Sequence, residues 1–225
     1  MHLFLIRHLE SEKNRKQSFA SFEDKEPLTE EGKKQGILLA KELKSFFEEN
    51  QWTIKQIYSA SSERAKQTAS MLSSTFGVPV QSYSSLCSSK TGVLQGKSEE
   101  EVAKERPEFI KQLYLYRKGI VSSYDFEIIE GKESKKSLEE RVMNTIQEII
   151  NIPGEDAKVI VFHRSSLTAA ILNFARQNSN YPKDFYGFIK LHYGFLTILN
   201  NEKDGMWTFD CVDEPVEKAK QFIKK

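Results

Sequence analysis

The stretch LIRHLESEKN, residues 5–14, places an arginine and a histidine at the end of a short apolar run. The run begins at Leu3, and a continuous apolar run of this length is typical of a strand that is buried on both faces in a parallel sheet. The guanidinium of Arg7 opposes protonation of the adjacent His8 ring. The sequence therefore predicts a buried strand that ends in a neutral histidine beside a fixed positive charge.

Two further apolar runs end in the same way. Residues 54–58 precede the segment SASSERA, which contains Arg64, and residues 159–162 precede His163 and Arg164. Patterns with helical periodicity alternate with these runs, and such alternation predicts a parallel sheet with right-handed crossovers. We therefore expect an α/β fold of three layers, with a doubly wound, mostly parallel sheet, helices on both of its faces and an inserted lid-like segment.

Start and stop signals delimit four helices. Thr29 is the expected N-cap of the first, and the second begins near Ser62 and ends at residues 77–79. The third covers residues 138–153, and the fourth follows His163. The first helix is expected to bury one apolar face, formed by Ile37, Leu38, Ala40, Leu43 and Phe47.

A single domain is expected for the whole chain, residues 1–225, which is long enough to bury a core of its own. Residues 80–135 are less regular: a serine-rich loop, residues 82–89, precedes a charged helix and an aromatic cluster. We interpret this segment as an insertion that packs over one end of the sheet as a lid. Residues 215–225 are interpreted as a surface helix.

The composition argues against several classes of protein. With 33 basic and 32 acidic side chains the net charge is +1, which predicts neither nucleic acid nor a membrane surface as a partner. The N-terminal apolar run is too short for a signal peptide or a membrane span. Cys87 and Cys211 lie far apart and form no zinc or disulfide motif. We therefore expect a cytoplasmic protein.

The carboxyl ends of neighbouring parallel strands meet at one edge of a sheet, where helix N-termini also gather. If the three predicted strands are neighbours, this edge collects Arg7, His8, Arg64, His163 and Arg164. Fixed cations around two histidines would repel a metal ion, so no metal site is predicted. The set is instead suited to a tetrahedral dianion, because guanidinium groups bind phosphate oxygens in a fork.

The first motif, LIRH followed by Glu10, Ser11 and Asn14, resembles the opening signature of the histidine phosphatase superfamily, which has the phosphoglycerate-mutase-like fold. Further segments resemble that family in the same order: PLTEEGKKQG from residue 27, IYSASSERAKQTA from 57, GVLQGKSEEE from 92, the pair Glu133 and Ser134 before Arg141, and VIVFHRSS from 159. The resemblance extends from residue 3 to about residue 170.

The resemblance implies a phosphatase that hydrolyses a small phosphorylated metabolite through a phosphohistidine on His8. It implies that Arg7, Arg64 and His163 bind the phosphoryl oxygens, with Asn14 at the rim of the site. A neutral imidazole is a competent nucleophile, and neighbouring cations keep it deprotonated near neutral pH. No metal and no cofactor is implied, and the expected partner is the small phosphorylated substrate.

Three positions depart from the family pattern. Glycine usually follows each of the two histidines, whereas this chain has Leu9 and Arg164. Leu9 must point away from the phosphate or narrow the pocket, and Arg164 either adds a phosphate contact or faces outward. The glutamate that commonly serves as general acid, four residues before Gly92, is replaced by Ser88. Other carboxylates are candidates for its role: Glu10, Glu12, Glu99, Glu100, Glu101, Asp125, Glu130 and Glu133.

Two alternatives to the phosphatase stay open. A phosphoglycerate-type mutase uses the same intermediate, but its basic and aromatic cluster is replaced here by Ser89, Lys90 and Thr91. A catalytically weak phosphate-binding or interaction module would account for the three departures from the pattern. The natural substrate and the oligomeric state are left open by the sequence.

Overall fold

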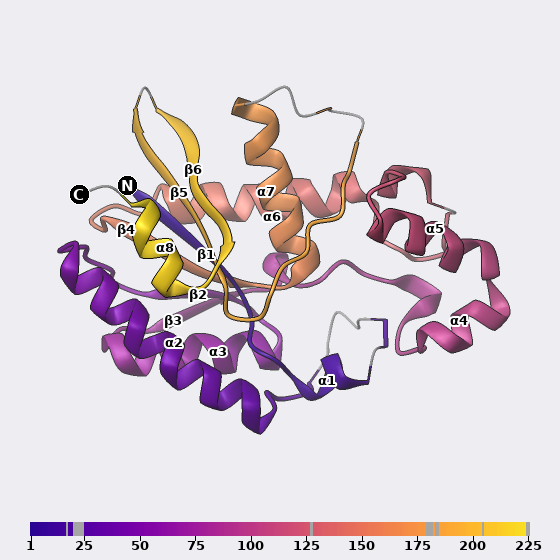
Figure 1. Cartoon of the computed structure of the whole chain (residues 1–225), viewed down its shortest axis with the longest axis horizontal. Coiled ribbons are helices and arrows are strands. Elements are labelled where there is room, and N and C mark those ends of the chain that lie inside the picture. Colours follow the sequence, from indigo (N-terminus) through magenta and orange to yellow (C-terminus); the bar gives the residue numbers. More distant parts are fainter. Residues whose placement is uncertain are drawn as a thin grey trace.

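The computed structural model describes residues 1–16, 18–19, 25–126, 128–178, 182, 185–203 and 205–223. Helices and strands alternate along most of the chain (Figure 1). In order they are β1 (His2–Arg7), α1 (Glu12–Arg15), α2 (Glu30–Glu49), β2 (Ile57–Ala60), α3 (Glu63–Phe76), β3 (Val80–Tyr83), α4 (Glu99–Glu105), α5 (Pro107–Arg117), α6 (Lys135–Ile150), β4 (Ala157–Phe162), α7 (Arg164–Asn178), β5 (Leu196–Lys203), β6 (Met206–Glu214) and α8 (Val216–Phe222). Short 3₁₀ turns lie at Ser84–Leu86, Gly92–Leu94 and Ser123–Asp125.

The strands form one six-stranded sheet in the order β3-β2-β4-β1-β5-β6. The first four are parallel neighbours, and β5 and β6 form an antiparallel hairpin beside β1. Helices α2 and α3 cover one face, and α6 and α7 cover the other (Figure 1). The expected three-layer α/β fold is confirmed, with a hairpin that the sequence patterns did not predict.

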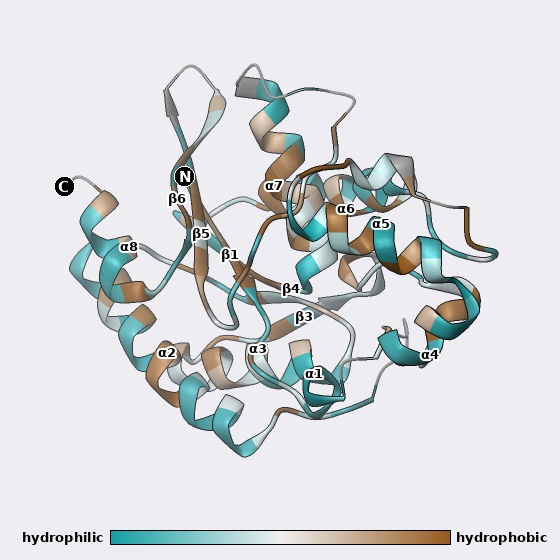
Figure 2. Ribbon diagram, turned by 45° about the vertical axis from the view of Figure 1, so that its right-hand side comes forward, coloured by the Kyte–Doolittle hydropathy of each residue, from teal (hydrophilic) through white to brown (hydrophobic). Residues whose placement is uncertain are grey.

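The central strands β1 and β4 are buried along their whole length, as their continuous apolar runs predict. In Figure 2 they are hydrophobic segments at the middle of the molecule, between helices that carry both hydrophilic and hydrophobic residues. Their register pairs Arg7 with Phe162, so β1 and β4 end side by side. This register brings the two histidine motifs to the same edge of the sheet.

Strand β2 begins and ends later than residues 54–58, the apolar run that predicted it. The carboxylate of Asp156 accepts from the backbone N–H of Thr53 (3.0 Å), and that of Glu155 accepts from the backbone N–H of Lys55 (2.5 Å). These bonds hold the start of the run outside the sheet, which β2 joins at Ile57. The strand therefore extends through Ser59 and Ala60, closer to Arg64.

Helix α2 begins as predicted, because the Thr29 hydroxyl accepts from the backbone N–H of Gly32 (2.9 Å). Its buried face differs from the prediction. Ile37 and Leu38 are 67% and 54% exposed. The face that packs on the sheet follows helical spacing through Gly32, Gly36, Leu39, Ala40, Leu43, Phe46 and Phe47, and residues 37 and 38 fall outside this stripe.

The segment of residues 80–135, expected as an insertion, begins with a strand of the sheet, since β3 pairs with β2. The part that lies off the sheet follows Tyr83 and contains α4 and α5, which extend to one side of the molecule (Figure 1). It has a small hydrophobic cluster of its own, formed by Leu94, Val102, Phe109 and Ile129.

At the other end of the molecule α8 packs on α2 and β6.

Candidate active site

The motifs predicted at three strand ends meet at one edge of the sheet. Arg7 is the last residue of β1, and His8 follows it. His163 follows β4, which pairs with β1. Arg64 is the second residue of α3, just beyond β2, which pairs with β4. The structure therefore brings these four side chains together.

Arg64 joins the two histidines. Its Nε donates a hydrogen bond to Nε2 of His8 (3.2 Å), and its Nη2 donates to Nδ1 of His163 (3.1 Å). Since Nδ1 of His163 accepts, the proton of this ring is on Nε2, which donates to the hydroxyl of Ser62 (2.9 Å). Arg64 is buried at a helix N-terminus, where the helix dipole disfavours a cation. A bound anion would offset both unfavourable effects.

The tautomer of His8 follows from its neighbours. Its Nδ1 donates to the backbone carbonyl of Leu9 (2.7 Å), so the lone pair is on Nε2, which faces Arg64. Burial, then the charges of Arg64 and Arg7, hold the pKa of His8 well below 6.5. Burial, His8 and Arg64 likewise lower the pKa of His163. Both rings are neutral at pH 7, and His8 presents an unprotonated nitrogen.

The lowered pKa values of His8 and His163 predict a pH dependence of stability. In the unfolded chain both histidines titrate near about 6.5, whereas in the fold they bind protons only well below that value. Below about pH 6.5 the unfolded state binds more protons. Lowering the pH should therefore decrease the free energy of unfolding, by about 1.4 kcal/mol per pH unit for each histidine. Urea denaturation in phosphate-free buffer from about pH 7 to about pH 5 measures the slope.

The control for this prediction is His8→Gln, which removes one of the two groups. Its slope should be smaller than that of the wild type by about one proton. Equal slopes in the two proteins would contradict the prediction.

Arg7 reaches the site from β1. Its Nη1 donates to the backbone carbonyl of Leu191 (2.5 Å), and its guanidinium carbon lies 3.9 Å from the ring centroid of Tyr193. Burial lowers the pKa of Arg7 to about 10, so it is still protonated at pH 7. Its Nε is buried and has no hydrogen-bond partner among the described residues. This N–H is a donor left for a ligand.

A cavity of about 450 Å³, here called the phosphate cavity, opens over these groups. Among the described residues that line it, five carry a positive charge and one, Glu99, is a carboxylate. Such a wall concentrates positive potential and attracts anions. The lining residues are Arg7, His8, Lys13, Asn14, Ser18, Phe19, Arg64, Ser88, Ser89, Thr91, Glu99, Leu113, Arg117, His163, Arg164, Ser165 and Tyr193.

The two remaining predicted site residues, Asn14 and Arg164, also line this cavity. The Oδ1 atom of Asn14 accepts from the hydroxyl of Ser11 (2.7 Å) and from its backbone N–H (3.1 Å). Its amide Nδ2 is therefore the group left to donate. Arg164 is exposed at the start of α7, with its guanidinium carbon 5.5 Å from the ring centroid of Phe188.

Comparison with known proteins places this geometry in a family. A sequence model described as "Histidine phosphatase superfamily (branch 1)" matches residues 3–213. The chain belongs to this superfamily. The expectation drawn from the motifs is confirmed over nearly the whole chain. No curated protein is significantly similar to it in sequence.

Solved structures share the fold of this histidine phosphatase superfamily member. Bacillus stearothermophilus YhfR is 20% identical, with a TM-score of 0.77 over 95% of this chain and 96% of the other. A mycobacterial glucosyl-3-phosphoglycerate phosphatase in complex with inorganic phosphate is 18% identical, with a TM-score of 0.73 over 96% and 98%. The alpha-ribazole phosphatase from Shigella flexneri is 18% identical, with a TM-score of 0.71 over 96% and 97%. At these identities the likeness establishes the fold.

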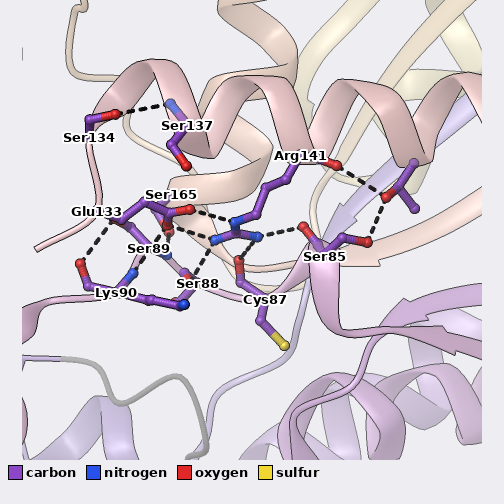
Figure 3. Close-up of polar contacts among 11 residues, drawn as sticks. Ser85, Cys87, Ser88, Ser89, Lys90, Glu133, Ser134, Ser137, Arg141 and Ser165 are labelled. Carbon is purple, nitrogen blue, oxygen red and sulfur yellow. Dashed lines mark hydrogen bonds and ion pairs between the residues drawn. The ribbon is translucent and has the colours of Figure 1, made fainter. Parts of the chain in front are cut away.

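In this superfamily member, Arg141 on α6 holds the serine-rich loop against the cavity (Figure 3). Its guanidinium donates to three backbone carbonyls of the loop, those of Ser85 (2.5 Å), Cys87 (3.0 Å) and Ser88 (3.0 Å). The carboxylate of Glu133 binds the same guanidinium at Nε (2.7 Å) and Nη2 (2.9 Å). The position of Ser88 in the cavity wall is therefore fixed by a satisfied polar network.

Leu9, which stands where the superfamily usually has glycine, points away from the phosphate cavity. It is 1% exposed and belongs to the main core, and it does not line the cavity. Two glycines make room for it. A Cβ built on Gly36 would lie 2.6 Å from Cδ1 of Leu9, and one on Gly194 would lie 2.9 Å from Cδ2. The departure at Leu9 therefore leaves the pocket open.

Gly36→Val is expected to destabilise the protein by about 1–3 kcal/mol, because its side chain would overlap Leu9 and Met71. Leu9→Ala creates space at the same point, so the double variant should lose less stability than the two single variants together. Ile37→Val, at the exposed neighbouring position, is the control. Urea denaturation measures all four. Strict additivity would show that Leu9 does not occupy the space beside Gly36.

No group of three or more His, Cys, Asp or Glu side chains that could hold a metal ion occurs in the part of the chain that the structure describes. Within the same residues, none of the helices is long and apolar enough to cross a membrane.

Several cavity residues were missed by the sequence analysis. Lys13 lies inside the first motif, directly before Asn14, and this place in the motif could have identified it as a site residue. Arg117 comes from α5 in the insertion, where no strand end or helix start marks it. Tyr193 directly precedes Gly194, just before the unpredicted strand β5, so its approach to Arg7 depends on tertiary packing.

Proposed function

We propose that the protein is a phosphatase that hydrolyses a small phosphorylated metabolite through a phosphohistidine on His8. The observation that carries this proposal is the unprotonated Nε2 of His8, which faces Arg64 in a buried, cationic cavity. A neutral imidazole with this tautomer can attack phosphorus once the N–H of Arg64 turns from Nε2 to the phosphate. The cations around it suit a transferring phosphoryl group, for which positioning and electrostatics supply most of the acceleration.

In the first step, Arg64 releases its hydrogen bond to Nε2 of His8 and turns to the phosphate, and Nε2 attacks phosphorus while the bond from phosphorus to the ester oxygen breaks. The ester oxygen leaves with the bonding electron pair as an alkoxide or aryloxide and takes its proton from solvent water. Arg7, Arg64 and His163 donate hydrogen bonds to the non-bridging oxygens, His163 turning its Nε2–H from Ser62 toward the phosphate. In the second step, water attacks the phosphohistidine, inorganic phosphate leaves, and His8 is restored. Asn14 and Arg164 contact the substrate at the rim.

The relatives support the phosphatase over its rivals. Two of the structures with this fold are named as phosphatases of small metabolites, a glucosyl-3-phosphoglycerate and an alpha-ribazole phosphate. The cavity volume of about 450 Å³ suits a ligand of this size. We further propose that the insertion acts as a lid within a single domain, because Thr91, Leu113 and Arg117 of this segment line the cavity.

We propose that Ser88 replaces the usual general acid and that no other carboxylate has taken over the role. Glu99 lines the cavity, but Arg117 binds both of its oxygens (2.9 and 2.5 Å) and lowers its pKa. An ionised carboxylate cannot donate a proton. Glu133 is bound by Arg141 outside the cavity lining.

The other candidates for the general acid do not line the cavity: Glu10, Glu12, Glu100, Glu101 and Glu130. Glu10 accepts from the hydroxyl of Thr29 (2.9 Å). The side chain of Asp125 lies outside the described residues. We propose in addition that the reaction needs no metal and takes place in the cytoplasm, where Cys87 and Cys211, both buried and free, stay reduced.

Incubation with 4-nitrophenyl phosphate in the presence of a chelator tests the proposed function. This ester needs little protonation of its leaving group, so hydrolysis unaffected by the chelator is the expected result. Transfer of labelled phosphate between positions of a phosphoglycerate, with little release of inorganic phosphate, would establish the mutase instead. Tight phosphate binding without turnover would establish the binding module.

A further inference from the structure

A second cavity of about 160 Å³, here called the side chamber, adjoins the phosphate cavity. The two cavities share six lining residues, including Phe19, Leu113 and Arg164. Arg164, the residue directly after His163, therefore lies where the two meet. A group attached to a phosphate in the first cavity can extend into the second.

Six aromatic residues are among the sixteen described residues that line the chamber. Tyr116 lies at the centre, with ring centroids 5.4 Å from Phe126 and 5.4 Å from Phe188, both in edge-to-face geometry. Phe109 packs edge-to-face on Phe126 at 5.7 Å. These are preferred arrangements of aromatic pairs, so the rings hold one another in place without a ligand. The wall is a preformed apolar surface.

Cations stand over these rings. The Nζ of Lys135 is 4.9 Å from the ring centroid of Tyr186, and the Nζ of Lys132 is 5.8 Å from that of Phe126. Arg164 adds a third positive charge. No carboxylate lines the chamber among the described residues. Burial, Lys132 and Arg164 lower the pKa of Lys135 to about 7, which shows how unfavourable its charge is in these surroundings.

Two hydroxyl groups of the chamber are also unpaired. The Oγ of Ser123 and the Oη of Tyr186 are buried and have no hydrogen-bond partner among the described residues. Buried polar groups are normally paired, and an unpaired one is costly unless a ligand completes it. The chamber thus combines apolar walls with positive charge and free hydroxyl donors.

We propose that the side chamber binds the leaving group of the substrate, and that this group is a single apolar ring bearing a carboxylate. The inference rests on the proposed phosphatase function. Three properties of the chamber select this occupant. Its volume fits one ring, since a cavity of about 150 Å³ binds benzene. Its rings provide stacking partners, and Lys135, Lys132 and the hydroxyls of Ser123 and Tyr186 provide donors for a carboxylate.

The chemistry of the reaction is consistent with this occupant. A hydroxyl group on an aromatic ring is more acidic than an aliphatic alcohol, so its anion leaves more readily without a proton donor. Among the described residues, Glu99 is the one carboxylate that lines the phosphate cavity, and Arg117 engages it, so it is not free to act as general acid. The apolar chamber and the missing acid, two separate observations, therefore favour the same class of substrate, a phosphorylated hydroxy-aryl carboxylate.

Two matched esters test the inference, 4-carboxyphenyl phosphate and 4-carbamoylphenyl phosphate, which differ in the charge of one substituent. The wild type should hydrolyse the carboxylate with a kcat/KM about 10- to 100-fold higher than that of the amide. In Lys135→Met this ratio should fall to near one, and in Lys132→Met it should fall in part. Lys136→Met, on the exposed side of α6, is the control and should keep the wild-type ratio.

Binding measured by calorimetry separates this inference from the proposed function. The probes are (4-carboxybenzyl)phosphonate and benzylphosphonate, which cannot be hydrolysed. Tighter binding of the first, lost in Lys135→Met, supports the chamber even if no ester is turned over, an outcome in which the phosphatase proposal alone fails. Hydrolysis of both esters at equal rates, with equal binding of both phosphonates, overturns the chamber proposal and leaves the phosphatase intact.

Discussion

Replacing His8 by alanine is expected to lower kcat/KM for an aryl phosphate by between about ten-thousand-fold and about a million-fold, as the loss of a catalytic nucleophile does in other enzymes. The alanine leaves Arg7 and Arg64 in place, so the phosphate cavity keeps most of its positive charge. Inorganic phosphate should therefore still bind, and the loss should appear mainly in kcat. Steady-state kinetics and calorimetry with phosphate measure the two effects.

The control for this prediction is His2→Gln, at the opposite end of the same strand and outside the cavity lining. It should keep its activity. A His8→Ala protein that retains more than about a hundredth of wild-type kcat/KM would contradict the assignment, because a general electrostatic role is worth roughly that much.

Leaving-group dependence is the second large effect expected of this site. Without a general acid, alkyl phosphates should react about 100- to 10,000-fold more slowly than activated aryl phosphates. The measurement is a series of esters with leaving groups of increasing pKa, for which log kcat/KM should fall steeply. Introducing an acid by Ser88→Glu should raise the rate of alkyl esters selectively, because Ser88 lines the cavity and its backbone is fixed by Arg141.

Glu99→Gln provides the comparison for the leaving-group series. If Glu99 remains ionised in its pair with Arg117, removing its charge should leave the slope of the series unchanged. Selective loss of the alkyl esters in Glu99→Gln would identify Glu99 as the general acid. A flat series in the wild type would show that some proton donor is present.

Much of the fold was predictable because its signals are local. The apolar runs at β1 and β4 are short and uninterrupted, and both strands are buried along their whole length. The N-cap at Thr29 and the positive φ of Gly77 at the end of α3 mark helix boundaries that depend on neighbouring residues alone. The convergence of His8, Arg64 and His163 followed from strand order, which right-handed crossovers restrict.

The parts that sequence reasoning missed depend on tertiary contacts. Ile37 and Leu38 are as apolar as the buried residues of α2, and only packing on the sheet determines which side faces inward. The hairpin of β5 and β6 has register shifts, which weaken the alternation that would have predicted it. The orientation of Leu9 depends on Gly36 and Gly194, far away in the sequence. Arg117 and Tyr193 enter the cavity from the insertion and from the segment before β5.

The central claim, a phosphohistidine on His8, is tested most directly by trapping it. The protein is mixed rapidly with ³²P-labelled aryl phosphate and quenched in alkali, in which phosphohistidine survives, and the labelled residue is identified by mass spectrometry. We expect label on Nε2 of His8, formed and lost at rates compatible with turnover, removed by acid and absent from His8→Ala. Turnover without any labelled enzyme in the presteady state, or label on a different residue, would contradict the account.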